Sequence, residues 1–266
     1  MNKEKIAELK RFSESLALEA ASLIKREMKS DRQVDFKGRR DMVTQVDRAS
    51  EALITRRISE FYPGHTILAE ESGGAQVLGD GYTWIIDPLD GTTNFVHGFP
   101  VFGVSIAVLK GQGILAAAIA DPTRDELFSA GLGLGASLNE SPIQVSSTAE
   151  LSHSLLATGF PYENDTNFDI NMRFWTEIYG KTQGLRRAGA AAIDLAWTAC
   201  GRLDGFWELG LKPWDLAAGV LLVREAGGLI SDPEGADLDI FTGDLLATNA
   251  LLHDEMLAEM KAIRSR

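Results

Sequence analysis

The amino-acid sequence predicts a layered α/β protein with mixed sheets, and three observations lead to this fold class. The chain has 266 residues, which is enough to bury a large core. Candidate helices and strands alternate along it, which favours helices packed on the faces of sheets. A hairpin signal also occurs, and hairpins join antiparallel strands, so a purely parallel sheet is not expected. We expect one domain over residues 1–266, built of two tightly packed halves with a boundary near residues 140–155.

Helical periodicity marks six segments. Apolar residues recur at helical spacing from residue 3 to about 29 and from 47 to 61, where Tyr62-Pro63-Gly64 ends the second helix. The polar residues 31–40 between them predict a loop. Four more helices are expected near residues 166–179, 190–200, 214–226 and 250–264. Gly227-Gly228 follows the third of these and is typical of a glycine C-cap.

Strand candidates lie between these helices. Residues 66–69 form a short one, and residues 82–86 form a β-rich run that we expect to stop at Asp87-Pro88. Residues 101–109 and 114–119 flank Lys110-Gly111-Gln112-Gly113, which predicts a hairpin. Further strands are expected at residues 126–130, 136–138, 155–158, 184–186 and 206–208.

Composition and charge exclude several classes of protein. The formal net charge is -12, and a chain this acidic is a poor binder of nucleic acid, whose phosphates need a basic face. No signal peptide is recognised and no apolar run reaches membrane-spanning length, so we expect a cytoplasmic protein without membrane contact. Cys200 is the single cysteine and lies in an apolar stretch, which predicts a small core residue rather than a nucleophile.

The densest chemical signal follows the strand at residues 82–86. Asp87 and Asp90 stand three residues apart around Pro88, and Gly91 and Thr92 come next. Proline restricts the turn, and glycine lets a ligand approach the backbone closely. The segment thus offers carboxylates for a metal and backbone N–H groups for a phosphate at the start of a short helix. An Asp-rich turn with an N-cap is the structural alternative.

Two further acidic positions could join this site. Glu70 and Glu71 follow the short strand at residues 66–69. Asp215 opens a predicted helix, where an aspartate taken alone is better explained as a cap or a partner of the helix dipole. Two carboxylates about 4 Å apart repel each other by roughly 4 kcal/mol at an effective dielectric near 20, so convergence would attract cations. Oxygen ligands select magnesium, manganese or calcium, and no histidine pair has the spacing of a zinc site.

Four segments together resemble the inositol monophosphatase family. Residues 87–95 (DPLDGTTNF) look like its first signature, and Trp214-Asp215-Leu216-Ala217-Ala218-Gly219, ending at Gly227-Gly228, looks like its second. Residues 41–47 (DMVTQVD) and 69–73 (AEESG) match two more family segments. The segments occur in family order and the resemblance covers nearly the whole chain. It points to the bacterial inositol-1-monophosphatase branch.

The resemblance implies a fold, a cofactor and an activity. The family fold is a five-layer αβαβα sandwich of the sugar-phosphatase kind, usually as a homodimer. Its members hydrolyse inositol monophosphate or a similar small polyol or sugar phosphate by an activated water. They use two or three magnesium ions, for which manganese can substitute, and lithium inhibits them.

The resemblance also assigns roles to individual residues. Glu70, Asp87 and the backbone carbonyl of Leu89 would hold the first metal, and Asp87, Asp90 and Asp215 the second. Asp47 would hydrogen-bond Thr92, which with Glu70 would orient and activate the attacking water. The N–H groups of Gly91 and Thr92 would bind the phosphate. On the substrate side, the hydroxyl groups would face Asp90, Gly189, Ala190, Ala191 and Glu208.

Some positions depart from the family pattern. Ala190 stands where many members have serine or threonine, and animal enzymes have serine near Arg187. Both differences lie on the substrate side and leave the substrate less certain than the phosphate chemistry. A family lysine has only an approximate match in Lys37.

Other functions compete with this one. A 3′-phosphoadenosine 5′-phosphate phosphatase would have Lys-Glu in place of Thr93-Asn94, whereas activity on fructose 1,6-bisphosphate or histidinol phosphate stays open. A non-catalytic role is the alternative from another class. Some bacterial relatives join the transcription antitermination machinery by binding RNA polymerase and Nus factors.

Overall fold

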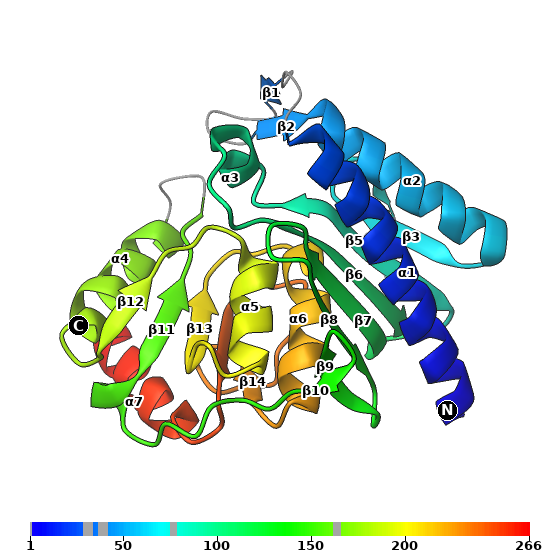
Figure 1. Ribbon diagram of the computed structural model, residues 1–266. Coiled ribbons are helices and arrows are strands. Elements are labelled where there is room, and N and C mark those ends of the chain that lie inside the picture. Colours follow the sequence, from blue (N-terminus) through cyan, green and yellow to red (C-terminus); the bar gives the residue numbers. More distant parts are fainter. Residues whose placement is uncertain (1, 29–33, 37–41, 75–78, 162–165) are drawn as a thin grey trace.

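The structure is a computed structural model that describes residues 2–28, 34–36, 42–74, 79–161 and 166–266. Its elements stack as five layers, which confirms the αβαβα expectation (Figure 1). Helices α1 (Lys3–Glu27) and α2 (Gln45–Phe61) form the first layer. They cover one face of an eight-stranded sheet, whose other face packs against α5 (Ala191–Ala199) and α6 (Pro213–Glu225). A five-stranded sheet follows, and α4 (Thr166–Tyr179) and α7 (His253–Arg264) form the fifth layer.

The eight-stranded sheet has the order β10-β9-β8-β7-β6-β5-β3-β4. Only the pair β3–β5 is parallel among its pairings. Its strands are β3 (Thr66–Ala69), β4 (Gly73–Gly74), β5 (Tyr82–Asp90), β6 (Gly103–Lys110), β7 (Gly113–Asp121), β8 (Glu126–Gly131), β9 (Gly135–Leu138) and β10 (Ser141–Pro142). The predicted hairpin is β6–β7, and Gly111 takes a positive φ of 55° in its turn.

The five-stranded sheet has the order β12-β11-β13-β15-β14. Strands β11 (Leu155–Thr158), β12 (Gly184–Arg186) and β13 (Gly205–Glu208) run parallel, whereas β15 (Leu245–Thr248) and β14 (Leu229–Ser231) are antiparallel neighbours. The sequence reading missed β14 and β15. It also missed the two-stranded ribbon of β1 (Val34–Phe36) and β2 (Met42–Thr44) and the single turn η1 (Leu151–His153). None of the described helices is long and apolar enough to cross a membrane.

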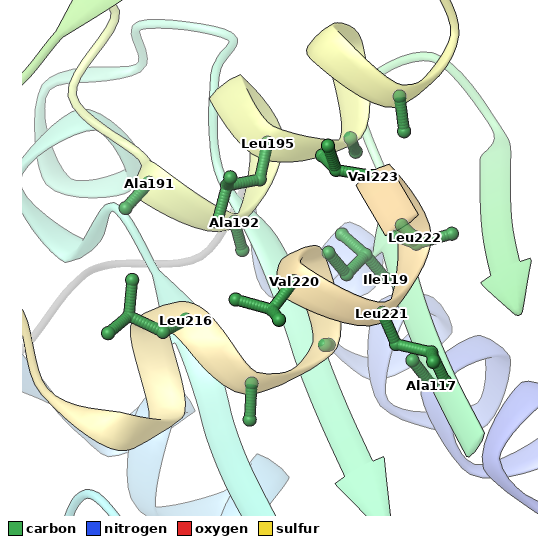
Figure 2. Close-up of a cluster of buried hydrophobic side chains, with 14 of the residues drawn as sticks. Ala117, Ile119, Ala191, Ala192, Leu195, Leu216, Val220, Leu221, Leu222 and Val223 are labelled. Atoms are coloured by element: carbon green, nitrogen blue, oxygen red, sulfur yellow. The ribbon is translucent and has the colours of Figure 1, made fainter. Parts of the chain in front are cut away.

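The middle helix layer is buried over most of its length. Figure 2 shows apolar side chains of α5 and α6, including Leu195, Leu216 and Val220, meeting in one cluster. The helices approach so closely that a Cβ at Gly219 would lie 2.4 Å from the Cβ of Leu195. Both helices are apolar nearly all round, because each is covered by a sheet on either side. The layer therefore fixes the second half of the chain against the first sheet. The same packing fixes the positions of the residues at the starts of α5 and α6.

One strand boundary was predicted wrongly. Strand β5 does not stop at Asp87-Pro88 but continues to Asp90, and its register with β6 shifts between Asp87 and Asp90. Pro88 has no N–H to donate, and a bulge is where a strand tolerates such a residue. The N–H of Leu89 turns inward and donates to Asp87 Oδ1 at 2.9 Å. The bulge therefore brings both aspartates to the same end of the strand.

Candidate active site

The site begins at the carboxyl end of β3, beside the parallel strand β5. Ala69 pairs with Ile86 in the β3–β5 register, so Glu70 and Asp87 are the next residues on neighbouring strands. The N–H of Glu70 donates to the carbonyl of Ile86 at 3.2 Å. Carboxyl ends of adjacent parallel strands meet at one edge of a sheet, and this is where α/β folds commonly bind ligands. The topology thus brings a glutamate and an aspartate from distant sequence positions to one edge.

Asp90 is held against the start of helix α5. It is 9% exposed, and its Oδ2 accepts a hydrogen bond from the N–H of Ala192 at 2.7 Å. The first N–H groups of a helix have no partner within the helix and favour an anion. This contact spans 102 residues and joins the two halves of the chain at the site.

Thr92 and Asp47 are in direct contact. The Thr92 hydroxyl donates to Asp47 Oδ1 at 2.7 Å, and it lies 3.1 Å from the carbonyl of Leu89. One hydroxyl proton serves the shorter bond, which leaves the Leu89 carbonyl available. The other oxygen of Asp47 accepts from the N–H and the hydroxyl of Thr44, at 2.9 and 2.5 Å, in a capping box at the start of α2. Asp47 is fully buried, so its position and the rotamer of Thr92 are fixed.

Gly91 caps the short helix α3 (Thr92–His97) and needs to be glycine for two reasons. Its φ is +88°, a left-handed conformation that side chains disfavour. A Cβ there would also lie 3.0 Å from the carbonyl of Val101 and 3.2 Å from Ala190 Cβ. The backbone N–H groups at this end can therefore be approached closely, as a phosphate site requires.

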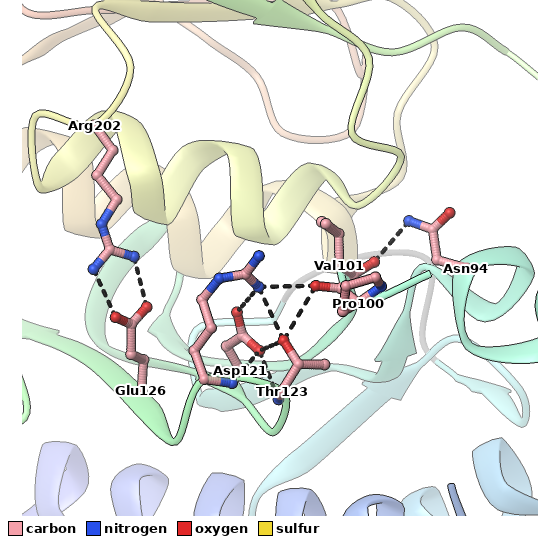
Figure 3. A network of polar contacts seen from close by, with 8 residues as sticks. Asn94, Pro100, Val101, Asp121, Thr123, Glu126 and Arg202 are labelled. Atoms are coloured by element: carbon pink, nitrogen blue, oxygen red, sulfur yellow. Dashed lines mark hydrogen bonds and ion pairs between the residues drawn. The ribbon is translucent and has the colours of Figure 1, made fainter. Parts of the chain in front are cut away.

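Asn94 ties the α3 segment to the second half of the chain. Its Nδ2 donates to the carbonyls of Val101 at 2.7 Å, Ala188 at 2.8 Å and Gly189 at 3.3 Å. Figure 3 shows the bond to Val101 beside a second network, in which Arg124 and Thr123 donate to the carbonyl of Pro100. The sequence alone indicates no such contact for Asn94, which there serves only to distinguish related phosphatases. The sequence feature that could have indicated this role is an asparagine directly after Gly91-Thr92-Thr93.

Asp215 and Glu208 enter from the second half. Asp215 lies in the first turn of α6 and caps it, because its Oδ2 accepts from the N–H of Lys212 at 2.7 Å. After burial and the charges of Glu70 and Asp90, the charge of Asp215 also contributes to the raised pKa of Asp87. Glu208 ends β13 and is 9% exposed. Its carboxylate covers Gly159, where a Cβ would lie 1.9 Å from Glu208 Oε2.

The remaining substrate-side residues surround the start of α5. Gly189 has a φ of +88°, and a Cβ there would lie 2.5 Å from an Arg187 guanidinium nitrogen. Ala190 is the N-cap of α5 and Ala191 its first residue, and both are buried. Ala190 lies against Gly91, so the start of α5 adjoins the turn before α3. Lys37 and Asp41, which took part in the family resemblance, lie outside the described residues.

The buried carboxylates raise one another's pKa. Burial, followed by the charges of Glu70, Asp90 and Asp215, raises the pKa of Asp87 well above its ordinary value. Burial raises the pKa of Asp90 to about 7 despite the N–H of Ala192. Burial raises the pKa of Glu208 to about 8, although the Arg187 guanidinium opposes the shift. A cluster of this kind is a candidate functional site, because its uncompensated charge is costly to the fold.

The donor set fits a hard divalent cation such as magnesium. All side-chain ligands on offer are carboxylate oxygens, and their mutual repulsion falls when a cation binds between them. In the described part of the chain, no three His, Cys, Asp or Glu side chains are placed so that they could hold one metal ion. Asp87, Asp90 and Asp215 each direct one oxygen to a backbone N–H instead. That each takes part as a ligand stays a prediction.

Comparisons with known proteins agree with the resemblance. The model of the inositol monophosphatase family matches residues 5–265. The chain is 49% identical to the inositol-1-monophosphatase of Synechocystis over 86% of its own length and 80% of that protein. It is 46% identical to the Nus factor SuhB of Escherichia coli K12 over 85% of its length and 84% of that protein.

A solved structure is similar over nearly the whole fold. The inositol monophosphatase from Anabaena sp. PCC 7120 superposes with a TM-score of 0.85 at 40% identity, covering 97% of each chain. The family model spans almost the entire sequence, and both relatives exceed the identity at which family membership is secure. The chain therefore belongs to the inositol monophosphatase family.

Proposed function

We propose that this protein is a magnesium-dependent phosphomonoesterase that hydrolyses inositol monophosphate or a similar small polyol phosphate. The observation that carries the proposal is the pair of buried aspartates Asp87 and Asp90 at the end of β5, because burial, followed by the charges of Glu70, Asp90 and Asp215, raises the pKa of Asp87. The backbone N–H groups of the Gly91 turn lie directly after it. Negative charge for a cation thus stands beside amides for a phosphate, in a protein whose net charge of -12 would otherwise repel the substrate.

The resemblance to the family supplies the proposed roles of the residues. Glu70, Asp87, Asp90, Asp215 and the Leu89 carbonyl would hold two or three magnesium ions, with manganese as a substitute. Bound magnesium would supply positive charge to the phosphoryl oxygens and lower the pKa of water. Glu70 would accept the proton of the attacking water, and the Thr92 hydroxyl, fixed by Asp47, would orient that water in line with the leaving alcohol. The N–H groups of Gly91 and Thr92 would hold the phosphate.

The substrate side supports a polyol. Glu208 and the backbone at Gly189 and Ala191 offer hydrogen-bond acceptors and donors for hydroxyl groups, as does Asp90. A fructose 1,6-bisphosphatase or histidinol-phosphatase activity is the alternative within the same chemistry. A screen that measures phosphate release from inositol 1-phosphate, fructose 1,6-bisphosphate, histidinol phosphate and p-nitrophenyl phosphate separates these possibilities.

The proposal is tested by metal removal within the same screen. Activity should disappear after EDTA treatment, return with magnesium and fall again with lithium. Glu70→Gln should lower kcat by at least about 10²-fold while the protein still folds, because a positioned base contributes about 10²–10⁴-fold. Full activity in EDTA would refute the metal requirement. Single-turnover hydrolysis in ¹⁸O-labelled water should label the first phosphate released, since no covalent nucleophile is proposed.

We also propose that the protein is a homodimer. Phe99 is 51% exposed and borders a hollow of about 600 Å³. Trp197 also lines this hollow, and its indole N–H is buried without a hydrogen-bond partner among the described residues. An exposed aromatic residue beside an unsatisfied donor is typical of a surface that is covered in an assembly. Analytical ultracentrifugation should give twice the monomer mass, and Phe99→Glu should give monomers.

A second candidate function is a role in transcription antitermination. It rests on the relatives from Escherichia coli and Pseudomonas aeruginosa that carry the name Nus factor SuhB, at 46% and 45% identity. We propose RNA polymerase or a Nus factor as a protein partner, since the acidic charge disfavours direct binding to RNA. Co-purification of RNA polymerase with the tagged protein tests this role. The Glu70→Gln variant should retain the partner if binding does not need catalysis.

A further inference from the structure

Asn171 is a buried polar residue to which the proposed mechanism gives no task. It lies in α4, in the fifth layer, and its side chain is fully buried. Its Oδ1 accepts a hydrogen bond from the indole N–H of Trp207 at 2.8 Å, and its Nδ2 donates to the carbonyl of Gly159. One side chain of the outer layer thus bonds two neighbouring strands of the second sheet, at Trp207 in β13 and at the residue that directly follows β11.

The two groups that Asn171 holds lie next to Glu208. Thr158 pairs with Trp207 in the parallel register of β11 and β13, so Gly159 and Glu208 are the next residues on neighbouring strands. Successive side chains of a strand point to opposite faces of the sheet. Trp207 packs with the side chains of α4 and α7, whereas Phe206 packs with those of α5 and α6. Glu208 therefore shares the face of Phe206, towards the middle helix layer, and Asn171 lies behind the opposite face.

Gly159 leaves the space in which the Glu208 carboxylate lies. A Cβ at Gly159 would lie 1.9 Å from Glu208 Oε2, 2.2 Å from its Cδ and 2.3 Å from its Oε1. The whole carboxylate thus occupies volume that a side chain at position 159 would fill, and a glycine permits this close approach. Because the carboxylate rests directly on the backbone of Gly159, its position depends on where that backbone is held.

We propose that Asn171 is a positioning residue for substrate choice, which fixes the backbone of Gly159 and through it the carboxylate of Glu208. The inference rests on the proposed function, because it takes Glu208 to bind the hydroxyl groups of the substrate. Without the Asn171 amide, the Gly159 carbonyl keeps the longer contact with the Thr158 hydroxyl, at 3.2 Å. A buried carbonyl that loses a donor moves towards another partner, so the support of the Glu208 carboxylate shifts.

The test compares Asn171→Ala and Asn171→Leu with the wild type on inositol 1-phosphate and p-nitrophenyl phosphate. Both variants remove the donor to Gly159, and leucine also refills most of the volume of the amide. Each should raise KM for inositol 1-phosphate about 10-fold, the effect expected when one hydrogen bond to a charged group is lost. Its kcat, and both constants for p-nitrophenyl phosphate, should change less than about 2-fold, because that substrate has no polyol for Glu208 to bind.

A double variant tests whether the effect passes through Glu208. Glu208→Ala removes the carboxylate and should by itself raise KM for inositol 1-phosphate. Adding Asn171→Ala to this variant should change KM by less than about 2-fold, because no carboxylate is left to misplace.

Asn249→Ala is the matched control for loss of stability. Asn249 is also buried, and its side chain also bonds the backbone at both ends: Nδ2 donates to the carbonyl of Thr148 at 2.8 Å, and Oδ1 accepts from the N–H of Leu252 at 3.2 Å. It lies near the other end of β13, where its N–H donates to the carbonyl of Asp204. This variant should lower the thermal midpoint as Asn171→Ala does, but it should keep the wild-type KM for inositol 1-phosphate.

Four results would overturn the inference. They are an unchanged KM for inositol 1-phosphate in the folded Asn171 variants, an equal rise in KM for p-nitrophenyl phosphate, a full effect of Asn171→Ala in the Glu208→Ala background, and failure of both Asn171 variants to fold. Inactivity of the wild type on every phosphate monoester would instead refute the proposed function. The wild-type assay therefore tells the two failures apart.

Discussion

Asn94 offers a sharp test of how the site is assembled. Its side-chain amide has two protons for the three carbonyls of Val101, Ala188 and Gly189, of which the first two are the close contacts at 2.7 and 2.8 Å. Asn94→Ala removes both bonds. At about 0.5–1.5 kcal/mol net for each, the free energy of unfolding should fall by about 1–3 kcal/mol.

Asn94→Ala should raise the activation free energy of phosphate hydrolysis by an amount comparable to its loss in the free energy of unfolding. The segment from Ala188 leads into α5, whose Ala192 N–H holds Asp90, so releasing it displaces a carboxylate of the site. If the whole loss appears in the transition state, kcat/KM falls by about 5- to 140-fold, since each 1.4 kcal/mol is a factor of ten. Phosphate release under saturating magnesium measures this, and urea denaturation measures the stability.

The variant Asn94→Asp makes the reasoning refutable. It keeps the shape but directs carboxylate oxygens at carbonyl oxygens, so it should be worse than Asn94→Ala in both assays. Asn139→Gly serves as the control, because Asn139 also bonds backbone groups through its side chain, at Leu127 and Asp125, but in the distant β8–β9 region. Its φ of 46° suits glycine, so this variant should lose stability without losing activity. An Asn94→Asp enzyme that matches or exceeds Asn94→Ala would refute the proposed clamp.

Three more predictions follow from the same geometry. Thr92→Ala should lose about 10²-fold or more in single-turnover phosphate release, whereas Thr92→Ser, which keeps the hydroxyl for Asp47, should retain most of the rate; equal losses would contradict a hydroxyl role. Gly159→Ala should push the Glu208 carboxylate aside and raise KM for polyol phosphates more than for p-nitrophenyl phosphate, and unchanged KM ratios would argue against Glu208 as the selective residue. For EDTA-treated protein, the thermal midpoint should rise as the pH falls from about 8 towards 5. Burial raises the pKa to about 7 for Asp90 and to about 8 for Glu208, so the folded state binds more protons than the unfolded state in this range. A thermal midpoint that falls as the pH falls would contradict these raised pKa values.

Much of the fold could be predicted from local patterns. Residues 66–69, 155–158, 166–179 and 184–186 form elements with the predicted bounds, because each is a periodic run between clear turn signals. Strand β15 was missed because Leu245–Thr248 is a four-residue apolar run that leads through Asn249 and Ala250 into more leucines, which hides its end. Such short central strands are defined by their neighbours rather than by their own sequence.

The site divides in the same way. The Asp87–Thr92 segment can be recognised from the sequence, because its residues are adjacent in the chain and their spacing suggests a role for each. Asn94 could not be assigned from sequence, since its role depends on hydrogen bonds to the carbonyls of Val101 and Ala188. The wrong end of β5 has the same origin, because whether a strand continues through Pro88 depends on a bulge with its partner strand.

The five-layer stack has a consequence for metal binding. The carboxylates proposed to hold metal come from two layers: Glu70, Asp87 and Asp90 lie at the end of the first sheet, and Asp215 lies at the start of α6 in the middle helix layer. Affinity for the proposed second metal would therefore depend on how the middle helix layer docks on the first sheet. A substitution deep between α5 and α6, such as one at Gly219, should weaken cation binding through a slight shear of the stack, with every acidic side chain left intact.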